Sequence, residues 1–318
     1  MSRQPNHGVG VMALGLIPCL LQLATPVAAA EFPLAADGKA IGAIAFYDTR
    51  PSDTLMDVAR SYDLGFTQLM ATNRGINPWM PPIGTRITLP NVYLLPNVPH
   101  EGIVIDLAAQ RLYYFPPGKS TVETYPIGIG VIGATTPVGT SRVTAKVANP
   151  TWYPPPSIRA ERPELPQSIP PGPDNPLGAY ALYLGWPAYR IHGTHKPDGV
   201  GRNVSHGCIR LYPEDIERLF HEVAVGTEVR VVNDDVRMAW IGDDLFVEAH
   251  PTKEQSDELD IEYRLTPTAP PADLDMRVAA VAGDQIRRVD RSIVRRVAVE
   301  RSGIPTRVTL PSRSGNPS

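Results

Sequence analysis

The sequence predicts a mostly β protein that also has a small α+β domain near its N-terminus and a partly helical C-terminal extension. Short β-prone segments separated by turns run through residues 101–250, as expected for a sandwich-like or barrel-like β domain. Residues 41–92 instead place two helical patterns between two strands. Residues 251–318 are charged and proline-rich, with an apolar stripe of helical spacing between Asp273 and Val299 and an end expected to be disordered.

Residues 1–30 have the features of a secretory signal peptide. Arg3 precedes an apolar run from Val11 to about Leu23, and three alanines at 28–30 supply small residues for cleavage before Glu31. The run is shorter than the roughly 20 apolar residues that a membrane span needs, although an uncleaved anchor is the alternative. The sequence therefore predicts an exported protein with no stable membrane span.

Charge and cysteine content exclude several classes of protein. The 318-residue chain has a formal net charge of −3 and no basic block, which argues against nucleic-acid binding. It has 2 cysteines, and only Cys208 remains once the signal peptide is removed. A single thiol cannot form an internal disulfide, so we expect packing alone to stabilise the mature chain.

Residues 41–92 predict a strand, two helices and a returning strand. Ser52 or Asp53 is placed to cap a first helix, a second helix fits 66–72, and strands are expected at 44–47 and 86–90. This order, together with DTLMDVARSYD and QLMATN…INPW, resembles a LysM domain, a module that binds glycans containing N-acetylglucosamine. A generic packing domain is the alternative.

Strands dominate the next segment. Residues 102–107 and 110–115 flank a tight turn and predict a hairpin, and further strands are expected at 124–129 and 142–147. Gly128, Gly130 and Gly133 match the spacing of a dinucleotide-binding loop, but Thr135-Thr136-Pro137 follows where that loop needs a helix. The sequence therefore predicts a glycine-rich β-loop and no cofactor.

A proline-rich stretch at 150–176 separates these strands from the rest of the β region. Connections of this length without secondary structure are usually functional or disordered, and we expect an ordered loop beside the active site. Strands at 180–184 and 188–192 follow, and then a helix at 214–223 with Ile216, Leu219 and Phe220 facing inward. Strands at 229–232 and 245–248 are expected to complete the β core.

The chemistry-bearing residues gather around Cys208. A nucleophilic cysteine needs a base to form the thiolate, and His192, at the end of an expected strand, can fold back onto it across a glycine-rich loop. A backbone carbonyl near Gly193 is placed to fix the tautomer of His192, because no Asp or Asn stands out for that purpose. Backbone N–H groups around Gly207 and Cys208 are the expected donors to an oxyanion.

Two other interpretations of these residues are weaker. A buried structural cysteine is common, but it is rarely flanked by a histidine and a glycine at a loop–strand junction. A zinc site has four possible ligands here: His192, His195, His206 and Cys208. Their spacing matches no zinc motif, so the sequence predicts no metal.

The residues around Cys208 also resemble a known family. An Ile-His-Gly-Thr run at 191–194 and a Ser-His-Gly-Cys-Ile-Arg run at 205–210 resemble the motif of YkuD-type L,D-transpeptidases. EGIVIDLAAQRLYYFP, TPVGTSRVTAKVANPTWYPPPSIRAE and LGAYALYLGWPAYRIHGT are similar to its Gram-negative periplasmic branch. That branch includes enzymes that attach the outer-membrane (Braun) lipoprotein to peptidoglycan. The resemblance spans about 41–250 and implies a YkuD-type β catalytic domain at 101–250.

The resemblance implies a periplasmic enzyme that acts on peptidoglycan stem peptides and glycan. Its cysteine attacks the carbonyl between meso-diaminopimelate and the terminal D-alanine of a tetrapeptide stem, D-alanine leaves, and an amine resolves the thioester. Cys208, His192 and Gly193 take the catalytic positions. The remaining matched positions shape the pocket (Ser205, His206, Gly207) or contact substrate (Thr194, His195, Arg210).

The sequence leaves open which group accepts the acyl chain and what roles His195 and Arg210 have. A lysine of a Braun-type lipoprotein, a second diaminopimelate (a 3-3 cross-link), a D-amino acid or water can all resolve the same thioester. The alternatives are therefore an L,D-carboxypeptidase or lipoprotein-releasing hydrolase, or a non-catalytic peptidoglycan-anchoring protein. His195 departs from the pattern, because asparagine is expected after Ile-His-Gly-Thr. Arg210 either holds a substrate carboxylate or braces the loop.

Overall fold

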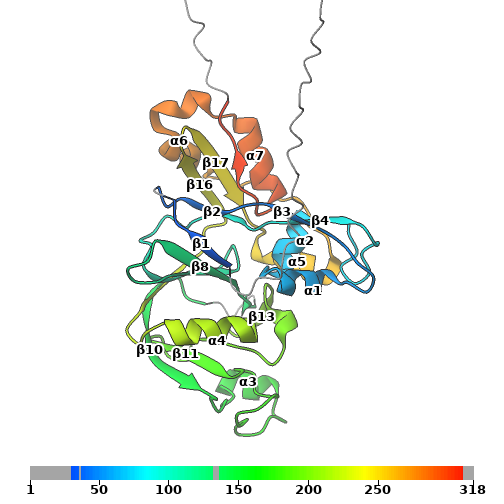
Figure 1. Ribbon diagram of the computed structural model, residues 1–318, viewed down its shortest axis with the longest axis vertical. Helices are drawn as coiled ribbons and strands as arrows, with labels where there is room; N and C mark the ends of the chain where they lie inside the picture. The colour runs from blue at the N-terminus through cyan, green and yellow to red at the C-terminus, as the bar shows by residue number, and fades with distance from the viewer. Residues whose placement is uncertain (1–29, 36, 132–135, 311–318) are drawn as a thin grey trace, which may run out of the picture.

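The computed structural model describes residues 30–310, apart from 36 and 132–135 (Figure 1). Residues 1–29 of the predicted signal peptide and the last residues of the predicted disordered end, 311–318, lie outside the described ranges. Within those ranges no helix has the length and apolarity needed to cross a membrane.

The N-terminal unit has the expected strand–helix–helix–strand order. Its elements are β3 (Ala45–Asp48), α1 (Leu55–Ser61), α2 (Phe66–Thr72) and β4 (Arg86–Leu89), with β3 antiparallel to β4. Two flanking strands, β2 (Ala40–Gly42) and β5 (Val92–Leu94), also pair antiparallel. Apolar side chains of α1, α2 and β4 form the buried centre of this unit.

The cap of α1 is Thr54, not Ser52 or Asp53 as expected. The Thr54 side chain accepts a hydrogen bond from the N–H of Asp57. Ser52 has a left-handed φ of 70° and lies in the preceding turn. The Asp53 carboxylate is occupied by the Tyr47 hydroxyl and the N–H of Arg50. The prediction was wrong by one or two residues because these neighbours serve the turn instead.

Nine described strands form a curled sheet that carries the expected hairpin. The strand order is β1-β8-β7-β6-β15-β10-β11-β12-β14. Neighbours are antiparallel except for β6 with β15 and β12 with β14. The bounds are β1 (Ala30–Pro33), β6 (Gly102–Asp106), β7 (Arg111–Phe115), β8 (Thr121–Pro126), β10 (Gly139–Ala148), β11 (Tyr180–Leu184), β12 (Arg190–His192), β14 (Ile209–Arg210) and β15 (Glu228–Val232).

Helix α4 (Pro213–Glu222) packs on this sheet and buries Ile216 and Leu219 in its core, as the periodicity predicts. A short parallel pair, β9 (Ile129–Gly130) with β13 (Asn203–Ser205), lies outside the nine-stranded sheet. The glycine-rich segment thus enters a β pair, and no helix follows it in the described residues 136–148. Two short helices, α3 (Pro156–Glu161) and the 3₁₀ turn η1 (Pro197–Gly199), complete this part of the chain.

The strand expected at 245–248 does not complete the β core. It lies in β17 (Asp244–Ala249), which pairs with β16 (Val236–Ile241) and β18 (Thr306–Arg307) in a separate sheet. The reason is packing: apolar residues of β16 and β17 form one buried cluster with those of the C-terminal helices. Those helices are α5 (Lys253–Glu262), α6 (Leu274–Ala282), η2 (Gly283–Arg288) and α7 (Arg291–Glu300).

Buried and exposed ion pairs join the three parts of the molecule. Figure 1 shows the C-terminal sheet with α6 and α7 at one end and β10, β11 and α3 at the other. Arg237 of β16 pairs with Asp106 of β6 at 2.5 Å, with both side chains buried. Removing one partner of such a pair leaves an uncompensated buried charge. Arg60 of α1 makes a two-pronged contact with Glu214 of α4 on the surface.

Candidate active site

The parallel pairing of β12 with β14 brings the predicted base and nucleophile together. Ile191 lies opposite Ile209, and His192 lies opposite Arg210. Cys208 immediately precedes β14, one strand away from His192. Because side chains alternate along a strand, this register aims the side chains at 192, 208 and 210 toward one face.

His192 is buried and has a fixed tautomer. Its Nδ1 lies 2.6 Å from the carbonyl oxygen of Gly193. A carbonyl oxygen only accepts, so Nδ1 carries the hydrogen and Nε2 keeps a free lone pair. Burial, aided by the positive charge of Arg210, lowers the pKa of His192 from 6.5 to about 3. The imidazole is therefore neutral at pH 7 and able to take a proton.

The thiol of Cys208 is half-buried and reaches a neighbouring turn. Its Sγ donates to the carbonyl oxygen of Ala188 at 3.5 Å, in the turn between β11 and β12. Ala188 has a left-handed φ of 71°. That strained residue presents its carbonyl to the sulfur, a contact that no motif in the sequence predicts.

Ser205 holds the loop that carries Cys208. Its Oγ donates to the carbonyl oxygen of Cys208 at 2.6 Å and accepts from the N–H of Gly207 at 3.1 Å. Gly207 has a φ of 100°, a conformation that side chains disfavour. The hydroxyl of Thr136 donates to the carbonyl oxygen of Gly207 at 2.8 Å. The N–H of Gly207, expected to serve an oxyanion, is thus engaged inside the loop.

Arg210 lies opposite His192 with a charge that nothing in the described part of the chain neutralises. Burial lowers the pKa of its guanidinium, which the nearby Cys208 opposes. No carboxylate within the described ranges forms an ion pair with it. Its backbone is fixed by two hydrogen bonds to Gly128. A half-buried cation without a partner suits an anionic ligand.

The other predicted residues lie around this centre with differing contacts. The buried hydroxyl of Thr194 is used within its own turn, where it contacts the backbone of Lys196. His195 is exposed, and its pKa is lowered by partial burial and by Lys196. His206 Nε2 lies 3.1 Å from the Oε2 of Glu161.

Glu161 belongs to the proline-rich segment, which forms an ordered loop beside the site as expected. The loop contains α3, and its Trp152 and Ile169 pair through their backbones. The buried side chain of Asn175 donates to the carbonyl of Pro150 at 2.8 Å and closes the loop. Glu161 and Thr136 were missed from the sequence, because no motif links them to a histidine or a loop far along the chain.

The four residues weighed as zinc ligands do not converge. Nδ1 of His192 is committed to a carbonyl, and His206 contacts Glu161. Among the residues that the structure describes, no group of three or more His, Cys, Asp and Glu side chains is arranged to hold a metal.

The site thus combines a thiol, a neutral imidazole of fixed tautomer and an unpaired guanidinium, the kinds of group that cysteine-dependent acyl transfer uses. The YkuD model, described as an L,D-transpeptidase catalytic domain, matches residues 100–231. The chain is 37% identical over 297 residues to the probable L,D-transpeptidase YcfS of Escherichia coli, covering 90% of each chain. It is 40% identical over 220 residues to the probable L,D-transpeptidase ErfK/SrfK of the same organism, covering 66% of this chain and 70% of that one.

The chain therefore belongs to the YkuD-type L,D-transpeptidase family. Among solved structures, an L,D-transpeptidase of Enterococcus faecium matches 42% of this chain and 50% of its own, with 26% identity and a TM-score of 0.34.

The buried, neutral state of His192 predicts a pH dependence of stability. His192 binds no proton in the folded state down to about pH 3, whereas in the unfolded chain it titrates near 6.5. Between these values the unfolded state binds the extra proton, so acidification lowers the free energy of unfolding by up to ~1.4 kcal/mol per pH unit. In His192→Gln, urea unfolding from pH 6 to pH 4 is expected to show a shallower loss. Equal slopes in both proteins contradict this prediction.

Proposed function

We propose that Cys208 is the nucleophile and His192 the base of an L,D-transpeptidase acting on peptidoglycan tetrapeptide stems. The fixed tautomer of His192, held by the Gly193 carbonyl at 2.6 Å, carries this proposal. It leaves Nε2 as the ring atom able to accept the thiol proton.

The acyl-enzyme forms when a bond from Cys208 to the substrate carbonyl replaces the bond from that carbonyl to D-alanine. Nε2 of His192 takes the proton from Sγ of Cys208, and Sγ bonds to the carbonyl carbon between meso-diaminopimelate and D-alanine. The bond from that carbon to the D-alanine nitrogen breaks, and the imidazolium returns its proton to the leaving amine. An incoming amine then attacks the thioester, loses a proton to His192 and releases the thiol.

The surrounding residues serve this reaction in different ways. With the N–H of Gly207 engaged by Ser205, we assign the oxyanion contact to the N–H of Cys208. Ser205 positions the loop, and Arg210 takes a substrate carboxylate. His206 contacts Glu161 of the proline-rich loop, to which we assign the donor side of the site, and exposed His195 is assigned to substrate contact.

Replacing the nucleophile tests this assignment. Cys208→Ala is expected to abolish D-alanine release while leaving the melting temperature within a few degrees of wild type. A carbapenem, which mimics the acyl donor, is expected to add its mass to the intact wild-type protein and not to the variant. The assignment is contradicted if Cys208→Ala retains activity, or if the carbapenem adds its mass to both proteins.

The acceptor is proposed to be an amine, in the periplasm after removal of the signal peptide. A lysine of a Braun-type lipoprotein or the side-chain amine of a second diaminopimelate would both resolve the thioester. Mass analysis of muropeptides from cells with and without the gene distinguishes them. Loss of lipoprotein-bound species identifies the first acceptor, and loss of 3-3 dimers the second. Loss of tripeptide stems alone contradicts transfer and indicates hydrolysis.

We further propose that residues 41–92 are a LysM-like module that holds the enzyme on glycan. Trp79 is 46% exposed, yet its ring is fixed. It stacks on Phe66, and its indole N–H donates to the Tyr263 hydroxyl at 2.7 Å. A rigid, half-exposed indole offers an apolar face to a sugar ring without losing rotamer freedom.

Trp79→Ala is expected to weaken retention on purified peptidoglycan by about tenfold, or ~1.4 kcal/mol. The matched control is Met80→Ala, which removes a more exposed neighbouring side chain without a ring. Sedimentation with increasing amounts of peptidoglycan gives both affinities. Equal weakening by the two substitutions, or none by either, contradicts a sugar platform at Trp79.

A further inference from the structure

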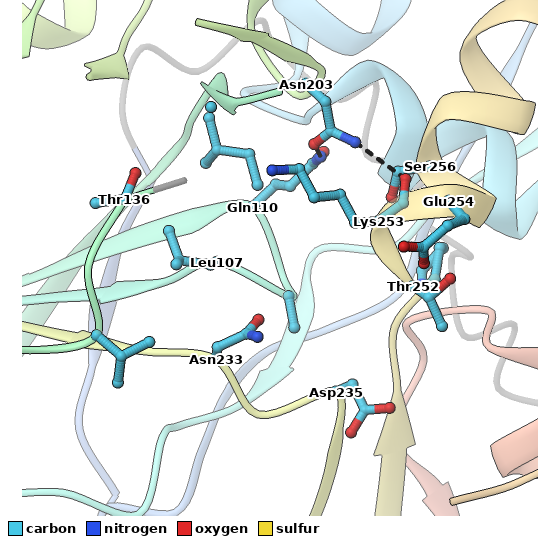
Figure 2. A pocket seen from close by; sticks show the side chains of 15 residues that line it. Leu107, Gln110, Thr136, Asn203, Asn233, Asp235, Thr252, Lys253, Glu254 and Ser256 are labelled. Atoms are coloured by element: carbon cyan, nitrogen blue, oxygen red, sulfur yellow. Dashed lines mark hydrogen bonds between the residues drawn. The ribbon is translucent and has the colours of Figure 1, made fainter. Parts of the chain in front are cut away.

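Strand β13, which leads directly into the Cys208 loop, does not pair with any described strand of the nine-stranded sheet. Among the described strands its partner is the two-residue β9, and the register between them is irregular. A cavity of about 440 Å³ lies along its side (Figure 2). The position of Ser205, the last residue of β13, therefore depends on contacts from outside the catalytic sheet.

One of these contacts comes from the N-terminal unit. A Cβ on Gly201 would lie 2.3 Å from Cα of Gly65, so the two backbones touch as only glycine allows. Thr67 of α2 donates its N–H to the Gly201 carbonyl at 3.2 Å, and its hydroxyl oxygen lies 2.8 Å from the same carbonyl oxygen. The start of the segment that becomes β13 is thereby fixed to α2.

The other contacts come from α5, in the C-terminal segment to which the sequence assigns no role. Asp260 pairs with Arg202 at 2.5 Å, and both side chains are mostly covered. The Nδ2 of Asn203 donates to the Asp257 carboxylate at 2.7 Å and to the Lys253 carbonyl at 3.1 Å. Figure 2 shows Asn203 pointing from its strand toward this helix, across the cavity from Thr252 and Asp235.

Asn203 also closes a chain of buried hydrogen bonds across all three parts. Its Oδ1 accepts from the Nε2 of Gln110 at 3.0 Å. The Oε1 of Gln110 accepts from the Thr67 hydroxyl at 2.6 Å. Every polar atom of the buried Asn203 amide is thus used, and its orientation is set by α5 on one side and by the β6–β7 turn on the other.

From this geometry we propose that Asn203 is a positioning residue for Cys208, and that α5 of the C-terminal extension is part of the device that aligns the nucleophile. Asn203 lies two residues before Ser205, whose hydroxyl holds the Cys208 carbonyl. The inference rests on the proposed function, because it concerns the alignment of Cys208 with His192. Small displacements of reacting groups cost large factors in rate.

The test is a charge exchange between β13 and α5. Asn203→Asp places a carboxylate against Asp257, so the two like charges push β13 off α5. We expect kcat for D-alanine release to fall about 10- to 100-fold with KM nearly unchanged. In Asn203→Asp with Asp257→Asn, the donor and the carboxylate change places while the contact with the Lys253 carbonyl stays lost, so kcat is expected to rise about threefold or more above that of Asn203→Asp.

Glu254→Gln is the matched control, because it removes an exposed α5 carboxylate that forms no hydrogen bond or ion pair with β13 in the described part of the chain. It is expected to leave kcat unchanged. Melting temperatures establish that each variant is folded. If Asn203→Asp does not fold, Asp257→Ala replaces it, since this variant deletes the acceptor without burying a new charge. A folded variant with wild-type kcat, or an exchange that restores nothing, overturns the proposal.

A second readout separates this proposal from the proposed function. Cys208 is the one cysteine of residues 31–318, so iodoacetamide alkylation at pH 7 reports the thiol alone. Misplacement from His192 is expected to slow alkylation about fivefold or more in Asn203→Asp, and the exchange is expected to restore it. Absence of D-alanine release in wild type overturns the proposed function. Unchanged alkylation in Asn203→Asp overturns the positioning of Cys208 whether or not the wild type turns over.

Discussion

The two-residue parallel pairing of β12 with β14 is the constraint on which the site depends. It places Arg210 opposite His192, and it places Cys208 immediately before the adjacent strand β14. A slip of β14 by one residue would turn Cys208 and Arg210 to the face opposite His192, because side chains alternate along a strand. The antiparallel pairing of β12 with β11 fixes the first strand, and the two backbone hydrogen bonds between Arg210 and Gly128 fix the second.

Burial keeps His192 uncharged. The interior around His192 and the nearby Arg210 both disfavour an imidazolium, which is why its pKa lies far below the ordinary value. The bond from Nδ1 to Gly193 then decides which nitrogen is left to act. A carboxylate in place of that carbonyl would favour a charged imidazolium. The neutral backbone acceptor fixes the tautomer of His192 without adding a negative charge beside the ring.

The sequence was informative wherever one local pattern decides the outcome. The hairpin at 102–115, helix α2 and the amphipathic helix α4 follow from turn residues and periodicity. The assignment of Cys208 and His192 to the site rests on their residue types and stays a prediction, although the structure places their strands side by side. The sequence could not show that β17 joins a second sheet, because its alternation fits either one. Nor could it place Glu161, Thr136 or Asn203, whose contacts join residues 45 to 93 positions apart.

The pairing of β17 with β18 has a consequence for how the molecule assembles. Val247 meets Thr306, about 60 residues later in the chain, and α5, α6 and α7 lie between them. All nine described strands of the curled sheet precede residue 233 in the chain, and β15, which ends at Val232, is the last of them. When the chain is synthesised from its N-terminus, the sheet that carries Cys208 can form before β18 is available to pair with β17. Chains that stop short of Thr306 would keep this edge exposed and prone to pair with one another, so the last strand protects the molecule against aggregation.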